Sequence, residues 1–278
     1  MKAILDIATI EKYILLHKKL RLPFTLIISN YTTRIVSKCY DIHFMKTEQG
    51  NRMFAAFSMI KSDCLKKKLP LLKKDTQYYS HAFKEAQFYA DTIYNFDLKA
   101  AYAYILYIDN FISKKTLDYI LKMPKMQRLT AVGMLAGKKE VFKMNADGDP
   151  INSEIIISPT ANYFFYCVQR TAEIINECSQ LLGNGFLFSW VDGIYFTENP
   201  DTVEKSSKII LEEFFKEKKL KVSFEILTQF NVEMKKTHFN CTYYKENALK
   251  SMKVPRIEYE TVKKITDFLL NRGKNLIL

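Results

Sequence analysis

The chain has 278 residues with a net charge of +12, and 48% of its residues are hydrophobic. This composition excludes a disordered chain and predicts a packed globular protein of one large or two small domains. The positive charge predicts a polyanionic partner such as nucleic acid, because Lys and Arg release counterions condensed on phosphates. The alternative is that an AT-rich genome has enriched lysine without selection for binding.

Further patterns exclude several classes of protein. The five cysteines form no Cys-x-x-Cys pair, which is typical of reduced thiols, and the four histidines lack the spacing of a zinc site. Asp6, Glu11 and Lys12 interrupt the N-terminus before a signal-peptide core could form, and no apolar run reaches about 18 residues. We therefore expect a cytoplasmic protein, in a bacterial or phage-infected cell, that has no membrane partner.

The first 75 residues are predicted to form a small β-rich region. Three β-prone segments lie at 22–30, 33–45 and 52–60, and they are typical of an antiparallel sheet. The lysine-rich segment 61–74 predicts an exposed basic connector that either contacts nucleic acid or is simply solvated.

The middle of the chain predicts alternating helices and strands. Residues 76–91 have helical spacing, and a strand follows at 92–98. Short helices are predicted at 100–108, 114–123 and 125–136, followed by strands at 138–144 and 152–158 that are joined by a turn.

The clearest helix covers residues 163–182 and is expected to stop at Gly183. It leads into a hairpin at 186–197, where Asp192 and Gly193 are the predicted corners of a type I′ turn. The remaining expected elements are a helix from Asp201 to about Lys218, strands at 221–227 and 232–245, and a final helix at 259–274.

Asp97 and Asp192 each follow an apolar, β-prone run. A carboxylate beside a core is costly unless it is paired or binds a cation. If the two strands are neighbours, a pair of Mg²⁺ ions would relieve the repulsion and bind substrate phosphates, as in phosphoryl transfer. From spacing alone, a helix N-cap at Asp97 and a turn corner at Asp192 is the alternative.

These residues carry a resemblance to family B DNA polymerases, in a minimal or divergent phage- or plasmid-like form. "DLKAAY" at 97–102 resembles motif A, with Asp97 on the metal-binding aspartate and Tyr102 on the tyrosine that excludes a 2′-hydroxyl. "FSWVDGI" at 188–194 resembles motif C, with Asp192 on its second aspartate and Trp190 in place of the first. The long helix before the hairpin also looks like the palm of that family.

The resemblance implies an α+β fold, with a palm-like antiparallel sheet backed by helices. The small β-rich region would occupy 1–75, and the palm 76–250 with short helical fingers at about 105–140. A C-terminal helix in 251–278 would be a thumb remnant. It also implies two Mg²⁺ ions, replaceable by Mn²⁺, a deoxynucleoside triphosphate and a primer-template nucleic acid. The implied contacts are Asp97, Asp192 and the Leu98 carbonyl for metal, Tyr102 and Arg128 for the nucleotide, and Lys235 and Lys236 for nucleic acid.

The predicted activity is template-directed nucleotide addition to a primer 3′-hydroxyl, without a proofreading exonuclease. Departures from the family pattern are Trp190 in motif C and a poor motif B around Arg128. One alternative is a palm that has lost catalysis and binds nucleic acid or another replication protein. Another is a reverse transcriptase-like polymerase, although Gly193 replaces the last aspartate of its Tyr-x-Asp-Asp motif. A third, an unrelated basic α/β protein, would hold Asp97 and Asp192 far apart.

Overall fold

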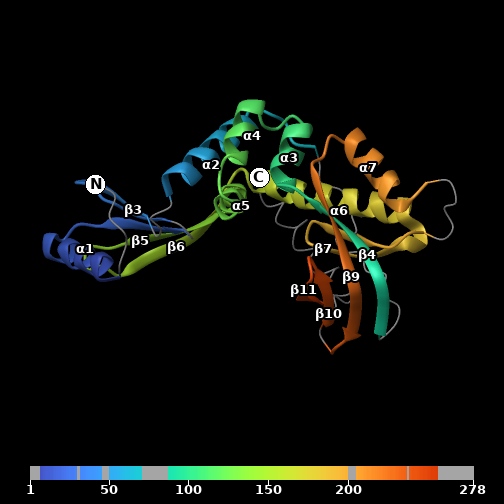
Figure 1. Cartoon of the computed structure of the whole chain (residues 1–278). Helices are drawn as coiled ribbons and strands as arrows, with labels where there is room; N and C mark the ends of the chain where they lie inside the picture. The colour runs from blue at the N-terminus through green and yellow to red at the C-terminus, as the bar shows by residue number, and fades with distance from the viewer. Residues whose placement is uncertain are drawn as a thin grey trace. The chain divides into compact units, whose positions relative to one another are not determined.

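The computed structural model describes residues 7–29, 32–45, 50–70, 87–199, 205–236 and 238–255, and it contains two antiparallel sheets with helices (Figure 1). The chain divides into two units that are interleaved in sequence. The first joins Met1–Lys68 with Asp118–Phe164, and the second joins Leu69–Leu117 with Phe165–Leu278. The domain boundaries predicted near residues 75 and 250 would instead divide the chain into consecutive segments. The mixed α+β class expected from the sequence is confirmed.

The first unit holds a five-stranded sheet in the order β3-β2-β1-β5-β6. Its strands are β1 (Phe24–Ser29), β2 (Thr32–Val36), β3 (Asp41–Met45), β5 (Lys138–Met144) and β6 (Pro150–Ile157). Helix α1 (Ile7–Leu20) packs Tyr13 and Ile14 against a core cluster that includes Phe24 and Ile35. Because β1 pairs with β5 as well as with β2, the predicted β-rich region is completed by a hairpin from more than 100 residues later.

The predicted strand at 52–60 is wrong, because these residues form helix α2 (Gly50–Cys64). Its buried residues Met53, Ala56, Ile60 and Cys64 recur every three or four positions, which is the spacing of one helix face. A short apolar run does not distinguish a strand from a buried helix by itself. The helix leads into the basic connector, of which residues 71–74 lie outside the described part of the chain.

The second unit holds a six-stranded sheet in the order β11-β10-β9-β4-β8-β7. Its strands are β4 (Gln87–Leu98), β7 (Phe186–Trp190), β8 (Gly193–Phe196), β9 (Val222–Met234), β10 (His238–Lys245) and β11 (Ala248–Pro255). Helices α3 (Ala101–Ile108), α4 (Lys114–Leu121), α5 (Lys125–Gly133) and α6 (Ala161–Leu182) lie between β4 and β7 in sequence, and α7 (Ser207–Glu217) lies between β8 and β9. Strands β4, β7, β8 and β9 thus follow a β-α-β-β-α-β order, with part of the first unit inserted after β4.

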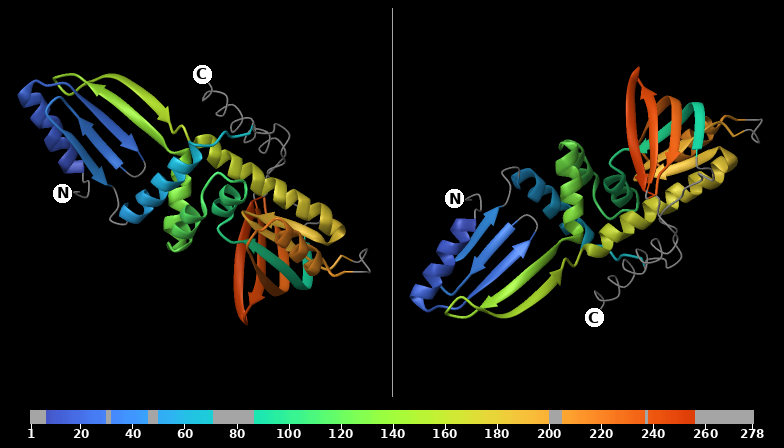
Figure 2. Two further views of the ribbon diagram at one scale, coloured as in Figure 1. Left: turned by 90° about the horizontal axis from the view of Figure 1, so that it is seen from above. Right: turned by 90° about the horizontal axis from the view of Figure 1, so that it is seen from below.

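Aromatic residues build the core between this sheet and its helices. Phe96 of β4 lies 5.8 Å from Phe196, 5.3 Å from Phe215 and 5.0 Å from Phe224 between ring centroids. Since Phe215 belongs to α7, these contacts fix α7 against the sheet. Figure 2 shows α6 and α7 on the same side of the strands. The opposite face of β4, where Ile93 points, packs against residues of β8, β9 and β10.

Several predicted elements agree with the structure, and others do not. The helices expected at 100–108, 114–123, 125–136 and 163–182 and the strands at 138–144 and 152–158 are confirmed. Residues 87–91, predicted as helix, are strand, and one strand β9 covers residues 222–234 where two were expected. Strand β11 was not predicted.

Other predictions fall on residues that the structure does not describe. They are the helix over 76–86, the capping of a helix by Asp201 and Glu204, and the C-terminal helix at 259–274 with its thumb role. Helix α7 begins at Ser207, and the Ser206 hydroxyl caps it by accepting from the Ile209 N–H. Among the described helices, none combines the length and apolar character needed to cross a membrane.

Candidate active site

Asp97 and Asp192 lie at neighbouring ends of two paired strands. Asp97 is the second-last residue of β4 and pairs directly with Gly193, the first residue of β8. The Leu98 N–H donates a 3.0 Å hydrogen bond to the Asp192 carbonyl oxygen. Strand pairing therefore brings together two acidic residues that are about 95 positions apart in the sequence.

The turn that carries Asp192 has a different register from the predicted one. Trp190 pairs with Gly193, so the two corner residues are Val191 and Asp192 rather than Asp192 and Gly193. Val191 has a φ of +58°, which is unusual for a β-branched residue. Gly193 instead avoids a tight contact, since a Cβ there would lie 3.1 Å from the Tyr195 ring. The prediction was wrong because it assigned this glycine to a positive φ.

A row of four residues crosses the sheet at the level of Asp97. It consists of Trp190 on β7, Gly193 on β8, Asp97 on β4 and Ser223 on β9. Directly paired residues of antiparallel strands point to the same face. Trp190 is partly buried and packs against the core cluster on this face. An indole therefore occupies the β7 position of the row, where motif C of the resembled family has a carboxylate.

A second row, two residues back along β4, was missed by sequence reasoning. Asn95 pairs with Tyr195 on one side and with Glu225 on the other. Asn95 is only 4% exposed, and its Oδ1 has no hydrogen-bond partner. The sequence signal was the period-two spacing of Asn95 and Asp97, which places both side chains on one face.

The two residues that pair with Asn95 are Tyr195, which has a defined protonation state, and Glu225, which has a defined ion-pair partner. Tyr195 stacks on Phe188 with 4.3 Å between ring centroids. Burial raises the pKa of Tyr195, and the nearby Tyr243 and Asp97 raise it further, so its hydroxyl stays protonated. The Glu225 carboxylate accepts from Lys245 Nζ at 2.7 Å. The second row thus presents a neutral phenol, a paired carboxylate and an unpaired amide oxygen.

The donor set at this end of the sheet fits a hydrated divalent cation. Mg²⁺ is usually bound through one or two carboxylates together with waters and substrate phosphates, and Asp97 and Asp192 supply two. Within the described ranges, no three His, Cys, Asp or Glu side chains gather into a metal-binding group. The remaining ligands would come from water, from substrate and from neutral oxygens such as the predicted Leu98 carbonyl.

Tyr102 follows a sharp turn from β4 into α3. The Lys99 N–H donates to the Lys221 carbonyl oxygen at 2.8 Å, and Ala100 has a φ of +50°. Tyr102 therefore lies in the first turn of α3 and is partly buried. The Cys167 thiol of α6 donates to the Tyr102 carbonyl oxygen at 3.7 Å. The turn places Tyr102 five residues beyond Asp97 on a helix that contacts α6.

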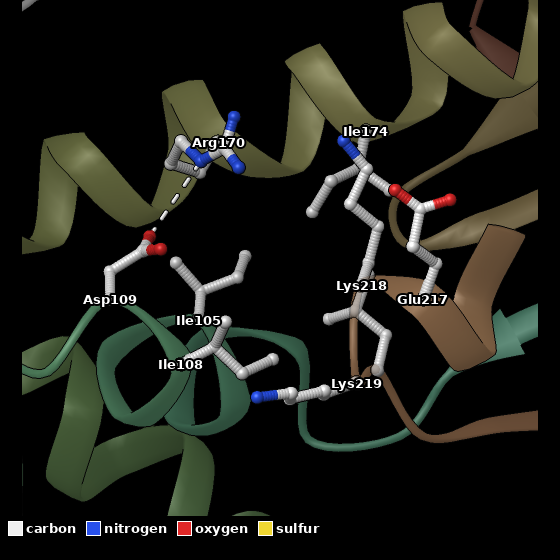
Figure 3. Close-up of a pocket in the computed structure, with 9 residues that line it drawn as sticks. Ile105, Ile108, Asp109, Arg170, Ile174, Glu217, Lys218 and Lys219 are labelled. Atoms are coloured by element: carbon white, nitrogen blue, oxygen red, sulfur yellow. Dashed lines mark ion pairs between the residues drawn. The ribbon is translucent and has the colours of Figure 1, made fainter.

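A cavity of about 250 Å³ lies between α3, α6 and the end of α7 (Figure 3). Its apolar wall is formed by Ile105, Ile108, Ile174 and Leu220. Charged groups of both signs complete the lining, namely Asp109, Arg170, Glu217, Lys218 and Lys219. The mixture of charges does not favour an anionic ligand over a cationic one.

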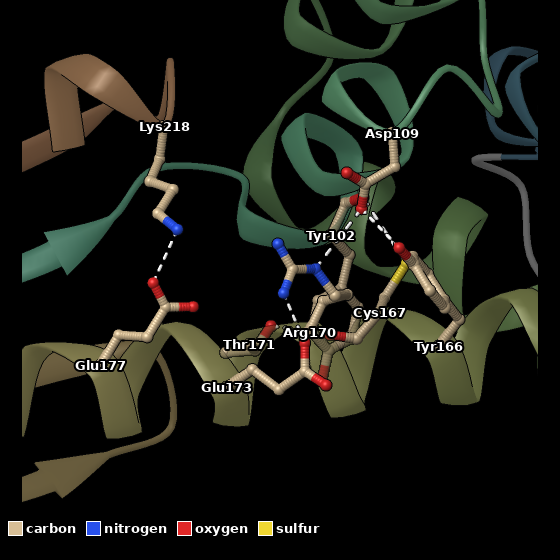
Figure 4. A network of polar contacts seen from close by, with 9 residues as sticks. All are labelled: Tyr102, Asp109, Tyr166, Cys167, Arg170, Thr171, Glu173, Glu177 and Lys218. Atoms are coloured by element: carbon tan, nitrogen blue, oxygen red, sulfur yellow. Dashed lines mark hydrogen bonds and ion pairs between the residues drawn. The ribbon is translucent and has the colours of Figure 1, made fainter. Parts of the chain in front are cut away.

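Much of this charge is paired within the protein (Figure 4). Arg170 forms ion pairs with Glu173 and, at 3.6 Å, with Asp109, and the Tyr166 hydroxyl donates to Asp109 at 2.8 Å. Burial lowers the pKa of Arg170, but its bond to Glu173 and the two carboxylate charges raise it above its ordinary value. Lys218 pairs with Glu177 at 2.6 Å. The network therefore fastens the end of α3 to α6, about two turns beyond Tyr102.

The remaining predicted site residues are Arg128, which belongs to the first unit, and Lys235 and Lys236, which follow β9 in the second. Arg128 is on α5 in the first unit. All residues of the site described above belong to the second unit. Lys235 and Lys236 follow β9 in its turn to β10, where the Lys235 N–H donates to the His238 carbonyl oxygen at 2.8 Å. Because Ser223 at the start of β9 pairs with Asp97, nearly the whole length of β9 separates these lysines from the carboxylates.

Comparison with known proteins adds no family to this picture. No protein-family model matches the chain, and no curated protein matches it significantly.

Proposed function

We propose that the second unit is a minimal polymerase palm that adds nucleotides to a primer 3′-hydroxyl under the direction of a template. The observation that carries this proposal is the β4–β8 pairing, in which Asp97 opposes Gly193 and the Leu98 N–H binds the Asp192 carbonyl. The β-α-β-β-α-β order supports it, because the sheet places β4, which carries Asp97, next to the β7–β8 hairpin, which carries Asp192. The palm of the resembled family likewise has one metal-binding aspartate on a central strand and another on the adjacent hairpin.

The roles follow from the chemistry of the named residues. Paired divalent cations, when bound, stabilise the charge on the attacking and leaving oxygens of phosphoryl transfer. Asp97 and Asp192 would hold them, with Mg²⁺ as the ordinary ion and Mn²⁺ as a substitute. Tyr102 would lie under the sugar of the deoxynucleoside triphosphate. The net charge of +12 supports binding of the primer-template.

Primer extension tests this function. The full chain is incubated with a labelled primer, a DNA or RNA template, deoxynucleoside triphosphates and Mg²⁺ or Mn²⁺. We expect Asp97→Asn and Asp192→Asn each to lower the rate by about 10³-fold or more, because loss of a metal contact removes several kcal/mol of charge stabilisation. Asp91→Asn, which replaces an exposed aspartate six residues earlier on β4, serves as the matched control. Extension that survives either active-site substitution contradicts the assignment, and a preference for the RNA template favours the reverse transcriptase-like form.

Tyr102 provides an independent test of the nucleotide site. Tyr102→Ala is expected to raise the use of ribonucleotides relative to deoxynucleotides, because loss of the ring opens space beneath C2′. Tyr104→Ala, a partly buried tyrosine of the same helix, is the control. Relative incorporation is measured with mixtures of the two triphosphates. An unchanged ratio in Tyr102→Ala counts against the sugar-gate role.

A second candidate function is a palm that binds nucleic acid or a replication partner without catalysis. Trp190 favours it, because this side chain stands in the row of Asp97 where the resembled motif has a carboxylate. This reading predicts primer-template binding that weakens steeply with salt, no extension on any template, and the same affinity for the wild type and Asp97→Asn. Fluorescence anisotropy at several salt concentrations measures that affinity.

A further inference from the structure

Asn95 presents an unpaired oxygen next to the candidate active site. The residue is 4% exposed, and Oδ1 has no hydrogen-bond partner. Buried polar atoms in native proteins are normally paired, so an exception calls for an explanation. Asn95 lies two residues before Asp97 on β4, and the two side chains therefore share one face of the sheet.

This oxygen lies close to the space left by Gly193. A Cβ on residue 193 would be 3.3 Å from Asn95 Oδ1 and 3.3 Å from the Trp190 carbonyl oxygen. The Tyr195 ring closes the third side of this narrow space at 3.1 Å, and the two oxygens that border it accept hydrogen bonds and cannot donate them. Gly193 is also the residue that pairs with Asp97. The space is therefore adjacent to the strand end that carries the carboxylates.

We propose that Asn95 is a positioning residue for a hydrated divalent cation held by Asp97, with its Oδ1 accepting a hydrogen bond from a water of that cation. The inference rests on the proposed function. Mg²⁺ gives up its waters reluctantly and keeps several of them when it is bound by one or two carboxylates. Asn95 Oδ1 and the Trp190 carbonyl oxygen are the two neutral acceptors beside the Gly193 space.

The neighbouring polar groups are consistent with this assignment. The Glu225 carboxylate is paired with Lys245, and Tyr195 is a protonated phenol because burial raises its pKa. A carboxylate at the Asn95 position would bind the cation directly in place of one of its waters, whereas a neutral amide oxygen accepts a hydrogen bond from such a water. Removal of a residue that hydrogen-bonds to a ligand or water of a metal typically weakens metal affinity 10- to 100-fold.

Mn²⁺ binding to the full chain tests the inference without relying on turnover. Free Mn²⁺ is measured by electron paramagnetic resonance during a titration, and water-proton relaxation reports the waters on the bound ion. We expect Asn95→Leu to raise the Kd for Mn²⁺ about tenfold or more. Gly193→Ala is expected to raise it as well, because a methyl group covers the amide oxygen. Asn231→Leu, which replaces an exposed asparagine of β9, should leave the Kd unchanged.

Asp97→Asn distinguishes the inference from the function on which it rests. If Asp97→Asn loses Mn²⁺ binding while Asn95→Leu and Gly193→Ala keep the wild-type Kd, the role of Asn95 is overturned and the metal site stands. If the wild type binds no Mn²⁺, both are overturned. Circular dichroism checks the fold of each variant, and Gly193→Ala alone decides if Asn95→Leu does not fold.

Discussion

Two buried polar side chains, one from each unit, differ in whether they are hydrogen-bonded. In the first unit, His17 is fully buried and stacks on Phe24 at 4.2 Å, and both ring nitrogens have partners. Nδ1 lies 3.2 Å from the Leu22 carbonyl oxygen and Nε2 contacts the Tyr40 hydroxyl. In the second unit, Asn95 is nearly as buried and its Oδ1 is unpaired. Paired polar groups stabilise a core, whereas an unpaired one costs about 1–3 kcal/mol. Asn95 therefore carries a cost that His17 does not, and Thr33 of β2 carries one too, because its Oγ1 is also buried without a partner.

The strongest test of this comparison is a pair of substitutions with opposite expected effects. Tyr40→Phe leaves His17 Nε2 buried without a partner, so the free energy of unfolding of the first unit should fall by about 2 kcal/mol. Asn95→Leu removes an oxygen that has no partner to lose, and the second unit should be at least as stable as in the wild type. Amide hydrogen exchange in β1 and in β4 measures the two units separately. Tyr13→Phe, which alters a neighbouring ring, is the control. Equal losses in Tyr40→Phe and Asn95→Leu would break the comparison.

A paired network within the second unit sharpens the contrast. Arg170→Leu leaves Asp109 and Glu173 without their cation, and their side chains are only 23% and 14% exposed. We expect a loss of about 1–2 kcal/mol in the free energy of unfolding, less than for a fully buried pair because solvent screens part of the charge. Lys205→Leu, which breaks the exposed pair with Glu213, should change it by less than about 0.5 kcal/mol. Urea denaturation compares the two variants, and similar losses in both would show that the network has no special role.

The pH dependence of the first unit tests the neutral state of His17. The Leu22 carbonyl can only accept, so Nδ1 carries the proton and Nε2 accepts from Tyr40. Burial lowers the pKa of His17 below its ordinary 6.5, although the bond to Leu22 opposes this. The unfolded chain therefore takes up the proton first. Stability should be full above about pH 6.5 and fall as the pH decreases through the lowered pKa. Hydrogen exchange in β1 at several pH values measures it, and His17→Gln should reduce this dependence.

The smallest expected effect concerns the backbone of the candidate site. Val191 is 72% exposed and has a φ of +58°, a conformation that costs a β-branched residue about 1–2 kcal/mol. Asparagine adopts this region more readily, so Val191→Asn should raise the free energy of unfolding of the second unit by about 1 kcal/mol. Val191→Ala keeps a Cβ and should gain less. If neither variant gains stability, the turn does not store strain.

Local sequence signals determined the elements whose apolar residues recur with a clear period or whose ends are marked by a glycine or a turn sequence. Helix α6 shows a helical apolar pattern that ends at Gly183, and the hairpin that follows it was expected from an Asp-Gly pair between apolar runs. The β5–β6 hairpin was expected from the turn around Gly148. Helix α2 was predicted as a strand, because its apolar residues form a short dense run in which the 3.6-residue period is hard to recognise.

The tertiary structure alone decided which segments pair and which atoms remain without partners. The pairing of β1 with β5 joins segments more than 100 residues apart, and the pattern of either strand is compatible with many partners. The unpaired Asn95 oxygen and the Val191–Asp192 turn follow from the register of β4, β8 and β7 around Gly193. The acidic residues of a carboxylate site can be recognised from the sequence alone. Its neighbours are set by long-range hydrogen bonding, which a linear pattern does not encode.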